Sequence, residues 1–279
     1  MAKLIADSGS TKTDWCLIQA NDETVRYSTI GLNPYFLNTD EIASEINDTL
    51  KSRLKEYPTE VHFYGAGCAN TDKRRSVEEA LQQCFPNSLI IVDTDLLGAA
   101  RALCGKEAGI ASILGTGSNS CYYDGKEIVN SVPSLGYILG DEGSGAYLGK
   151  QLLKAYVYNE LPNHLQEAFS EEYQLNRDHI VEAVYRKPLP NRFLASFAPF
   201  LKKNEADLFI QAIVYEAFNS FIKHHIHKYK TFGKHKLHAT GSIAWHFSEI
   251  LQKTCTDNNI ELGTVLQSPM EGLITYHKQ

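Results

Sequence analysis

Two short polar turns carry the residue types with the clearest chemical potential in this chain. They are Asp7-Ser8-Gly9-Ser10-Thr11-Lys12-Thr13 and Gly115-Thr116-Gly117-Ser118-Asn119, and each follows a short apolar run and precedes a strand-like stretch. Glycine lets the backbone approach an anion closely, while amide N–H groups and Ser/Thr hydroxyls supply hydrogen-bond donors. Two such turns facing each other would hold a polyphosphate from both sides.

Composition and charge exclude several other functions. A net charge of −6 over 279 residues and a pI near 5.9 offer no basic surface to nucleic acid or to an acidic membrane. The chain lacks a basic leader, and no apolar run approaches the roughly 20 residues needed to span a bilayer. The cysteines are scattered with no C-x-x-C pair, which favours reduced thiols. We expect a cytoplasmic protein with no nucleic-acid or membrane partner and, because dimers are common among enzymes, a homodimer.

The apolar pattern predicts the same opening for both halves of the chain. In the first half, strands are predicted near 3–7, 13–19, 24–30, 60–64 and 89–92, with helices near 39–55, 73–84 and 95–103. In the second half, strands are predicted near 110–114, 120–123, 127–132 and 237–240, with helices near 143–158, 178–186 and 205–229. The repeated opening predicts two lobes, 1–106 and 107–279, the second with helical additions.

A duplicated lobe with a phosphate turn in each half resembles the actin, hexokinase and heat-shock chaperone ATPase superfamily. Within it, the chain is most similar to the N-acetylglucosamine kinase and BadF/BadG/BcrA/BcrD ATPase family. The likeness rests on the two turns and on four further segments, Gly31-Leu32-Asn33, Asp95 to Ala99, Gly140 to Ser144, and Thr240-Gly241-Ser242. In the first turn, Ser8 and Ser10 stand where glycines are usual. The resemblance implies an α/β fold of two actin-like (ribonuclease H-like) lobes with a nucleotide and sugar cleft between them.

The resemblance also implies a role for each segment, with ATP and Mg²⁺ as cofactors and a small-molecule amino sugar as partner. Asp95 would be the general base that accepts the proton of the attacking hydroxyl, and Asp7 would hold Mg²⁺ through water. The implied nucleotide-binding residues are Ser8, Gly9, Ser10, Thr11, Lys12, Gly115, Thr116, Gly117, Gly241 and Ser242. The implied sugar-binding residues are Asn33, Asp95, Ser118, Asn119, Gly136, Asp141 and Ser144.

Several of these residues have a purely structural alternative. Asp95 and Asp141 each precede a predicted helix, and aspartate is a favoured N-cap. Asn33 stands before a proline, where it would also serve as a turn residue. Gly241-Ser242 could be an ordinary turn from strand to helix. Asp93 lies two residues before Asp95 and is the competing candidate for the base.

Other phosphate chemistries fit less well. A Walker A loop needs glycine directly before Lys12 and again five residues earlier, where Thr11 and Ala6 stand. Residues 90–95 look like the Asp-x-Asp motif of haloacid-dehalogenase-type phosphatases, but Leu97 replaces the usual Thr or Val. The related ATPases that activate 2-hydroxyacyl-CoA dehydratases carry paired cysteines with no counterpart here. Sugar-responsive regulators of the superfamily usually carry an N-terminal DNA-binding module, for which a first turn at residue 7 leaves no room.

The residues and the resemblance together predict an ATP-dependent kinase that phosphorylates a hydroxyl of an amino sugar, with N-acetylglucosamine as the first choice. The resemblance implies that this hydroxyl is O6. N-acetylmuramic acid and glucosamine are the alternative acceptors, and a BadF-type ATPase or a non-catalytic sugar sensor is the further alternative. The main departure from the family is Pro133-Ser134-Leu135-Gly136, which stands where a Gly-Gly-Trp-Gly run often lines the N-acetyl side of the sugar. Substrate choice depends on this segment more than reaction type does.

Overall fold

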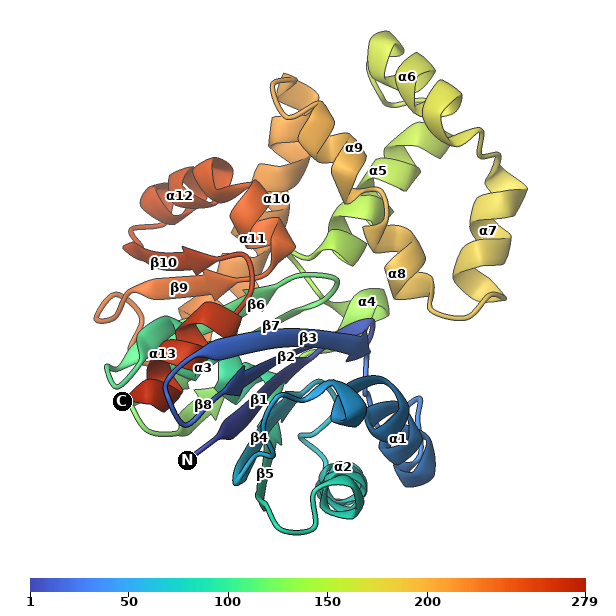
Figure 1. Cartoon of the computed structure of the whole chain (residues 1–279). Helices are drawn as coiled ribbons and strands as arrows, with labels where there is room; N and C mark the ends of the chain where they lie inside the picture. The colour runs from blue at the N-terminus through green and yellow to red at the C-terminus, as the bar shows by residue number, and fades with distance from the viewer. The chain divides into compact units, whose positions relative to one another are not determined.

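The computed structural model describes all residues from Met1 to Gln279, and the chain divides into two compact units (Figure 1). The first unit comprises 1–107, 125–128 and 268–279, and the second comprises 108–124 and 129–267. No helix has both the length and the apolar run needed to cross a membrane. The six cysteines are buried, and none forms a disulfide.

The first unit is built on a five-stranded sheet with the order β3-β2-β1-β4-β5. Its strands are β1 (Lys3–Ser8), β2 (Lys12–Ile18), β3 (Thr24–Ile30), β4 (Glu60–Gly65) and β5 (Leu89–Thr94). The first three strands pair antiparallel, whereas β4 and β5 run parallel to β1. The carboxyl ends of β1, β4 and β5 consequently meet at one edge of the sheet.

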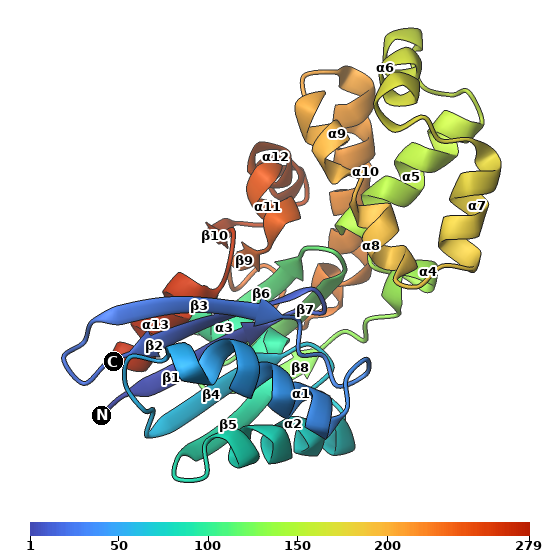
Figure 2. The ribbon, with the colours of Figure 1, turned by 45° about the vertical axis from the view of Figure 1, so that its right-hand side comes forward.

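Helices cover both faces of this sheet, as the turned view in Figure 2 shows. They are α1 (Thr39–Glu45), α2 (Thr71–Cys84), α3 (Asp95–Cys104) and α13 (Met270–Lys278). The predicted helix 39–55 is interrupted, because α1 continues as a π-helical turn (Ile46–Leu50) and a 3₁₀ turn (Lys51–Arg53). One face packs a core that includes Trp15, Phe63 and Leu81, and the other packs Tyr64 with residues of α13.

The C-terminal helix α13 corrects the predicted domain boundary. The division into 1–106 and 107–279 assigned this helix to the second lobe, but it packs in the first unit against α3. The two helices are so close that a Cβ on Gly272 would lie 2.2 Å from the carbonyl oxygen of Ala102. At the end of α13, His277 Nε2 lies 2.9 Å from the hydroxyl of Tyr64 on β4. The close contact at Gly272 and the hydrogen bond of the half-buried His277 place this helix in the first unit, and neither contact produces a periodic sequence pattern.

The second unit repeats the sheet of the first. Its strands are β6 (Gly109–Leu114), β7 (Ser118–Tyr123), β8 (Ile128–Ser131), β9 (Leu237–Thr240) and β10 (Leu262–Leu266). The order is β10-β9-β6-β7-β8, with β6 antiparallel to β7 and parallel to β9, and β9 parallel to β10. Read from the other edge, this is the order and direction of the first sheet. The predicted duplication and α/β fold class are therefore confirmed.

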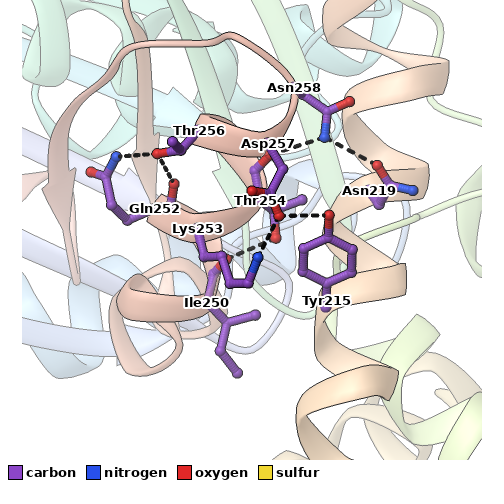
Figure 3. A network of polar contacts seen from close by, with 9 residues as sticks. All are labelled: Tyr215, Asn219, Ile250, Gln252, Lys253, Thr254, Thr256, Asp257 and Asn258. Carbon is purple, nitrogen blue, oxygen red and sulfur yellow. Dashed lines mark hydrogen bonds and ion pairs between the residues drawn. The ribbon is translucent and has the colours of Figure 1, made fainter.

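The helices of the second unit form most of its mass. They are α4 (Gly136–Leu139), α5 (Gly145–Val157), α6 (Asn163–Tyr173), α7 (Arg177–Tyr185), α8 (Pro190–Ala195), α9 (Ala198–Lys203), α10 (Leu208–His224), a 3₁₀ turn (Ile226–Lys228), α11 (Ser242–His246) and α12 (Ser248–Asp257). The core between them includes Phe200, Phe218 and Phe221. Figure 3 shows the polar contacts that join α10 to α12, among them the 2.9 Å bond from the Tyr215 hydroxyl to the Asp257 carboxylate.

Candidate active site

Parallel strands bring two predicted site segments to one edge of the first sheet. Ser8 on β1 is aligned with Gly65 on β4, and Gly65 is aligned with Thr94 on β5. Asp95 follows directly as the first residue of α3. Because the carboxyl ends of parallel strands are where α/β folds bind ligands, the first turn (residues 7–13) and the predicted base lie where chemistry is expected.

Ser8 supports the first turn from within. Its side chain is 1% exposed, and its hydroxyl lies 2.8 Å from the hydroxyl of Thr13. Both hydroxyl oxygens accept the backbone N–H of Leu32 at 3.2 Å. The serine at this family glycine position therefore uses its side chain to join the turn to the following loop, and only its backbone remains as a predicted phosphate contact.

The outer part of the first turn is exposed. Gly9, Thr11 and Lys12 all reach the surface, and the N–H of Gly9 closes the turn onto the carbonyl of Lys12 at 3.0 Å. The ammonium of Lys12 lies 2.6 Å from the Asp14 carboxylate. An incoming phosphate would meet backbone donors here together with a lysine that is paired but solvent-accessible.

Asn33 lies beside this turn but is buried, with 7% of its surface exposed. Its side-chain amide donates to the hydroxyl of Ser10 at 2.8 Å, and its side-chain oxygen accepts the N–H of Tyr35 at 2.9 Å. An asparagine amide has two N–H donors and two acceptor lone pairs, so one of each remains for a ligand. Both readings from the sequence are compatible with this geometry, since Asn33 shapes its loop and keeps capacity for a sugar.

The structure shows that Asp95 is not the N-cap of α3. The N-cap of α3 is Thr94, whose hydroxyl accepts the N–H of Leu97 at 3.1 Å. The Asp95 carboxylate accepts backbone N–H groups, among them the adjacent N–H of Leu96 at 2.8 Å. Since Thr94 satisfies the helix terminus, the Asp95 carboxylate is not required as its cap.

Asp93 lies in a different environment. Its carboxylate oxygens are each 3.9 Å from a guanidinium group, one from Arg74 and one from Arg101. Arg101 also donates to the Tyr64 hydroxyl at 2.8 Å. Asp93 is thus engaged with two cations beneath the strand ends, whereas no cation is paired with Asp95. This contrast favours Asp95 over Asp93 as the proton acceptor.

Asp7 and Asp95 form a pair of electrostatically coupled carboxyl groups. Burial, with the charges of Asp95 and Asp14, raises the pKa of Asp7 to about 7. Burial likewise raises the pKa of Asp95, against a smaller opposing effect of the Leu96 N–H. No group of three or more metal-ligating side chains is present. An oxygen-only donor set with few carboxylates fits Mg²⁺, which keeps most of its waters and takes its remaining ligands from phosphates.

The second turn, residues 115–119, packs onto the start of α5. The N–H of Gly115 bonds to the carbonyl of Gly117 at 3.0 Å. The N–H groups of Gly145 and Ala146 donate to the carbonyls of Gly115 and Thr116 at 2.8 and 3.1 Å. Because the first amides of α5 are used in this way, the helix fixes the shape of the turn.

Asp141 is held in a strained position beside this turn. It is 8% exposed and has a φ of 58°, a left-handed conformation that is uncommon for residues other than glycine. One carboxylate oxygen accepts the N–H of Ser118 at 3.4 Å and the hydroxyl of Ser134 at 3.3 Å. A Cβ on Gly117 would lie 3.0 Å from the other oxygen. Burial raises the pKa of Asp141.

The remaining predicted sugar contacts are not all equally available. Ser144 is completely buried and caps α5, since its hydroxyl accepts the N–H of Tyr147 at 3.1 Å. Asn119 is half-buried, and its side-chain oxygen accepts the N–H of Ser120 at 2.9 Å. Gly136 begins α4 with a φ of 70° and has open space around its Cα. The hydroxyl of Ser118 is buried without a hydrogen-bond partner, which marks it as a group that a ligand could satisfy.

Glu142 is a residue of this region whose role the sequence did not suggest. Its carboxylate lies 3.5 Å from a ring nitrogen of His224 and 3.5 Å from one of His225. His225 is 5% exposed and stacks on the ring of Phe221, and burial lowers its pKa. The Gly140–Ser144 loop is thereby fastened to the end of α10. The adjacent histidines at 224 and 225 were the available signal, but they had no acidic residue near them in the sequence.

A cavity of about 550 Å³ opens from the second turn within the second unit. It is lined by three groups of residues, the turn itself, α11 and the α8–α9 segment, namely Gly115, Thr116, Gly145, Ala195, Ala198, Pro199, Lys202, Lys203, Ser242, Ile243, His246 and Phe247. Gly241, at the entrance to α11, has a φ of 117°, and a Cβ there would lie 2.4 Å from the Leu114 carbonyl. The predicted adenosine turn and second phosphate turn therefore share one cavity, whose α8–α9 wall the sequence did not reveal.

Two copies of the same sheet, each opening on a glycine-rich turn, define an actin-like fold. The model of the BadF/BadG/BcrA/BcrD ATPase family matches residues 6–274, and the chain belongs to this family. A structure from Porphyromonas gingivalis, described as a "putative N-acetylglucosamine kinase", is 45% identical with a TM-score of 0.93, and the alignment covers 98% of each chain.

More distant structures share the fold alone. One from Chromobacterium violaceum, also described as a "putative N-acetylglucosamine kinase", is 17% identical with a TM-score of 0.75, covering 99% of this chain and 98% of that one. A ROK family glucokinase from Streptomyces griseus, in complex with glucose and AMPPNP, is 12% identical with a TM-score of 0.59, covering 100% of this chain and 98% of that one.

Proposed function

We propose that this protein is an ATP-dependent sugar kinase that transfers the γ-phosphate of ATP to O6 of N-acetylglucosamine. The proposal rests on the carboxylate of Asp95, which neither caps α3 nor pairs with a cation. This carboxylate lies at the strand edge that also bears Asp7 and the first turn. Membership of an ATPase family and the likeness to a kinase-type structure at 45% identity support it.

Asp95 acts as the general base. In phosphoryl transfer the protein mainly positions the reactants and accepts a proton from the attacking hydroxyl as the new P–O bond forms. Burial raises the pKa of Asp95, which makes this carboxylate a better proton acceptor than an exposed one.

Asp7 would hold Mg²⁺. When bound, the ion neutralises charge on the β- and γ-phosphates and polarises the transferred group. The neighbouring charge of Asp95, which contributes to raising the pKa of Asp7 to about 7, is the repulsion that a cation would relieve. Thr11 and the side chain of Lys12 bind phosphate oxygens.

The adenosine portion of ATP occupies the cavity of the second unit. A volume of about 550 Å³ suits a nucleotide, and its walls combine apolar side chains such as Ile243 and Phe247 with the ammonium groups of Lys202 and Lys203. Gly115 and Thr116 are placed to bind phosphate oxygens at its inner end. The residues of this wall do not by themselves specify which base is bound, so the choice of adenine rests on membership of the ATPase family.

In the second unit the proposed sugar contacts are Asp141, Asn119 and the unpartnered hydroxyl of Ser118. In the first unit the proposed sugar contact is Asn33. N-acetylmuramic acid is the alternative acceptor. Serine at 134 and an exposed Leu135 replace the bulky family aromatic, leaving room for a substituent on the sugar ring.

An ADP-release assay tests the proposal. Mg-ATP is offered with N-acetylglucosamine, N-acetylmuramic acid, glucosamine, N-acetylmannosamine or glucose, and with no sugar. Turnover that depends on N-acetylglucosamine supports the proposal, while dependence on another sugar replaces the substrate. ADP release at an equal rate without sugar would identify an ATPase instead.

A further inference from the structure

The two serines at family glycine positions in the first turn have different partners. Ser8 is buried and bonds to Thr13 and to the backbone of Leu32. Ser10 is only half-buried, and its hydroxyl accepts the side-chain amide of Asn33 at 2.8 Å. Glycine at position 10 could not make this bond. The substitution at position 10 therefore creates a side-chain link between the first turn and the loop at 31–35.

Asn33 has little freedom to turn away from Ser10. Its side-chain oxygen is engaged with the N–H of Tyr35, and a Cβ on Gly67 would lie 2.8 Å from that same oxygen. The backbone carbonyl of Asn33 accepts the N–H groups of Phe36 and Leu37 at 3.0 and 3.1 Å. Asn33 thus links the orientation of its side-chain amide to the backbone conformation of residues 35–37.

The backbone contacts follow the same path. The N–H of Gly31 bonds to the carbonyl of Thr11 at 3.0 Å, and a Cβ on Gly31 would lie 2.4 Å from the backbone carbon of Ser10. On its far side the loop is anchored by Lys73 of α2, whose ammonium donates to the carbonyl of Pro34 at 2.9 Å. A displacement of the turn is consequently transmitted to a loop that is fixed at its other end.

We propose that Ser10 is a positioning residue that couples occupation of the first turn by nucleotide to the presentation of Asn33. When phosphate orders the turn, the Ser10 hydroxyl holds one Asn33 N–H, so the second N–H and the second oxygen lone pair are set for the acceptor. The sugar part of this inference rests on the proposed function, whereas the link between nucleotide and loop does not.

Hydrogen–deuterium exchange of the full chain, with and without Mg-AMPPNP, tests the link. Peptides covering 32–37 are compared in wild type, Ser10→Ala, Ser10→Gly and the matched control Ser44→Ala, whose exposed hydroxyl bonds only within the α1 region. A hydrogen bond worth about 1 kcal/mol corresponds to roughly a five-fold effect. We expect AMPPNP to slow exchange at 32–37 about five-fold in wild type and Ser44→Ala, and to lose this effect in both Ser10 variants while nucleotide still binds. Equal protection in the Ser10 variants would overturn the coupling.

Steady-state kinetics separate this inference from the proposed function. In Ser10→Ala we expect the KM for N-acetylglucosamine to rise about five-fold, with the KM for ATP changed less than two-fold. Because the Ser10→Gly variant restores the family residue, it is expected to fold, and thermal denaturation checks this. If wild type does not turn over any sugar, the kinase proposal fails, and the exchange experiment still decides the coupling. Unchanged sugar KM in a sugar-dependent enzyme would refute the role of Ser10.

Discussion

The first and second turns occupy equivalent places in two sheets of the same topology, yet different contacts hold them. The first turn bonds to its own loops through Ser8 and Ser10, and lies beside the carboxyl groups of Asp7 and Asp95. The second turn is fixed by the backbone of α5 and opens into a cavity of about 550 Å³. Both units share one sheet topology, and under the proposed function the first unit supplies charge and proton transfer while the second provides the cavity for the nucleotide.

The largest expected effect tests where proton transfer takes place. Asp95→Asn removes the proposed base without changing shape, so we expect kcat to fall by about 10²–10⁴-fold with little change in ATP binding. Asp93→Asn is the matched control, since that carboxylate contacts Arg74 and Arg101 instead. We expect Asp93→Asn to lower the melting temperature and to leave kcat nearly unchanged. Loss of turnover in Asp93→Asn with near-normal turnover in Asp95→Asn would reverse the assignment.

The next effect concerns the metal and again the first unit. Asp7→Asn removes a carboxylate that would hold Mg²⁺ through water, and such outer contacts are worth about 10–100-fold in metal affinity. We expect the Mg²⁺ concentration for half-maximal activity to rise by at least ten-fold, as read from Mg²⁺ titrations at saturating ATP. An unchanged Mg²⁺ requirement would remove Asp7 from the metal site.

A smaller and more selective effect is expected in the second unit. Ala198 lines the cavity, so Ala198→Phe should fill part of it and raise the KM for ATP by about ten-fold, while the sugar KM stays within two-fold. Ala20→Phe, at an exposed position of the first unit, controls for the added side chain. If Ala198→Phe changed both KM values equally, the separation between the two units would not hold.

Sequence reasoning captured the features that repeat. Alternating apolar runs predicted the strands that begin both halves, and the order of glycine-rich segments predicted the family. It missed α13, because the position of this helix depends on the close contact of Gly272 with α3 and on the bond between His277 and Tyr64. It also missed the α8–α9 wall of the cavity. Both depend on contacts between residues distant in sequence, which leave no local period.

The same limit applies to individual site residues. The sequence placed Ser144 among the sugar contacts, but the fold makes it a buried helix cap. Ser8 and Ser10 were indistinguishable as glycine replacements, and only their hydrogen-bond partners tell them apart. Glu142 carried no role until the fold brought it to His224 and His225.

The smallest expected effect concerns stability and a residue outside the proposed site, His277 at the end of α13 in the first unit. Burial, His62, Arg101 and Lys3 lower the pKa of His277 to about 3, so this ring is neutral in the folded protein. An unfolded histidine has a pKa near 6.5, so the stability that His277 contributes is present above that pH and is lost as pH falls towards 3.

We therefore expect His277→Gln to melt about 2–4 °C below wild type at pH 7.5, where the contact with Tyr64 is disturbed. At pH 5 the gap should close or reverse, because the variant has no buried imidazole to protonate. Thermal melts at both pH values check this, and Ser44→Ala should show no such crossover. A gap that is the same at both pH values would contradict the account.

The most direct test of the central claim is ³¹P NMR of a reaction containing Mg-ATP, N-acetylglucosamine and the purified protein. The account predicts that a sugar 6-phosphate resonance grows at the rate of ADP, and that Asp95→Asn, which still binds ATP, gives none. Growth of inorganic phosphate without a sugar phosphate, or an unchanged product signal in Asp95→Asn, would contradict it.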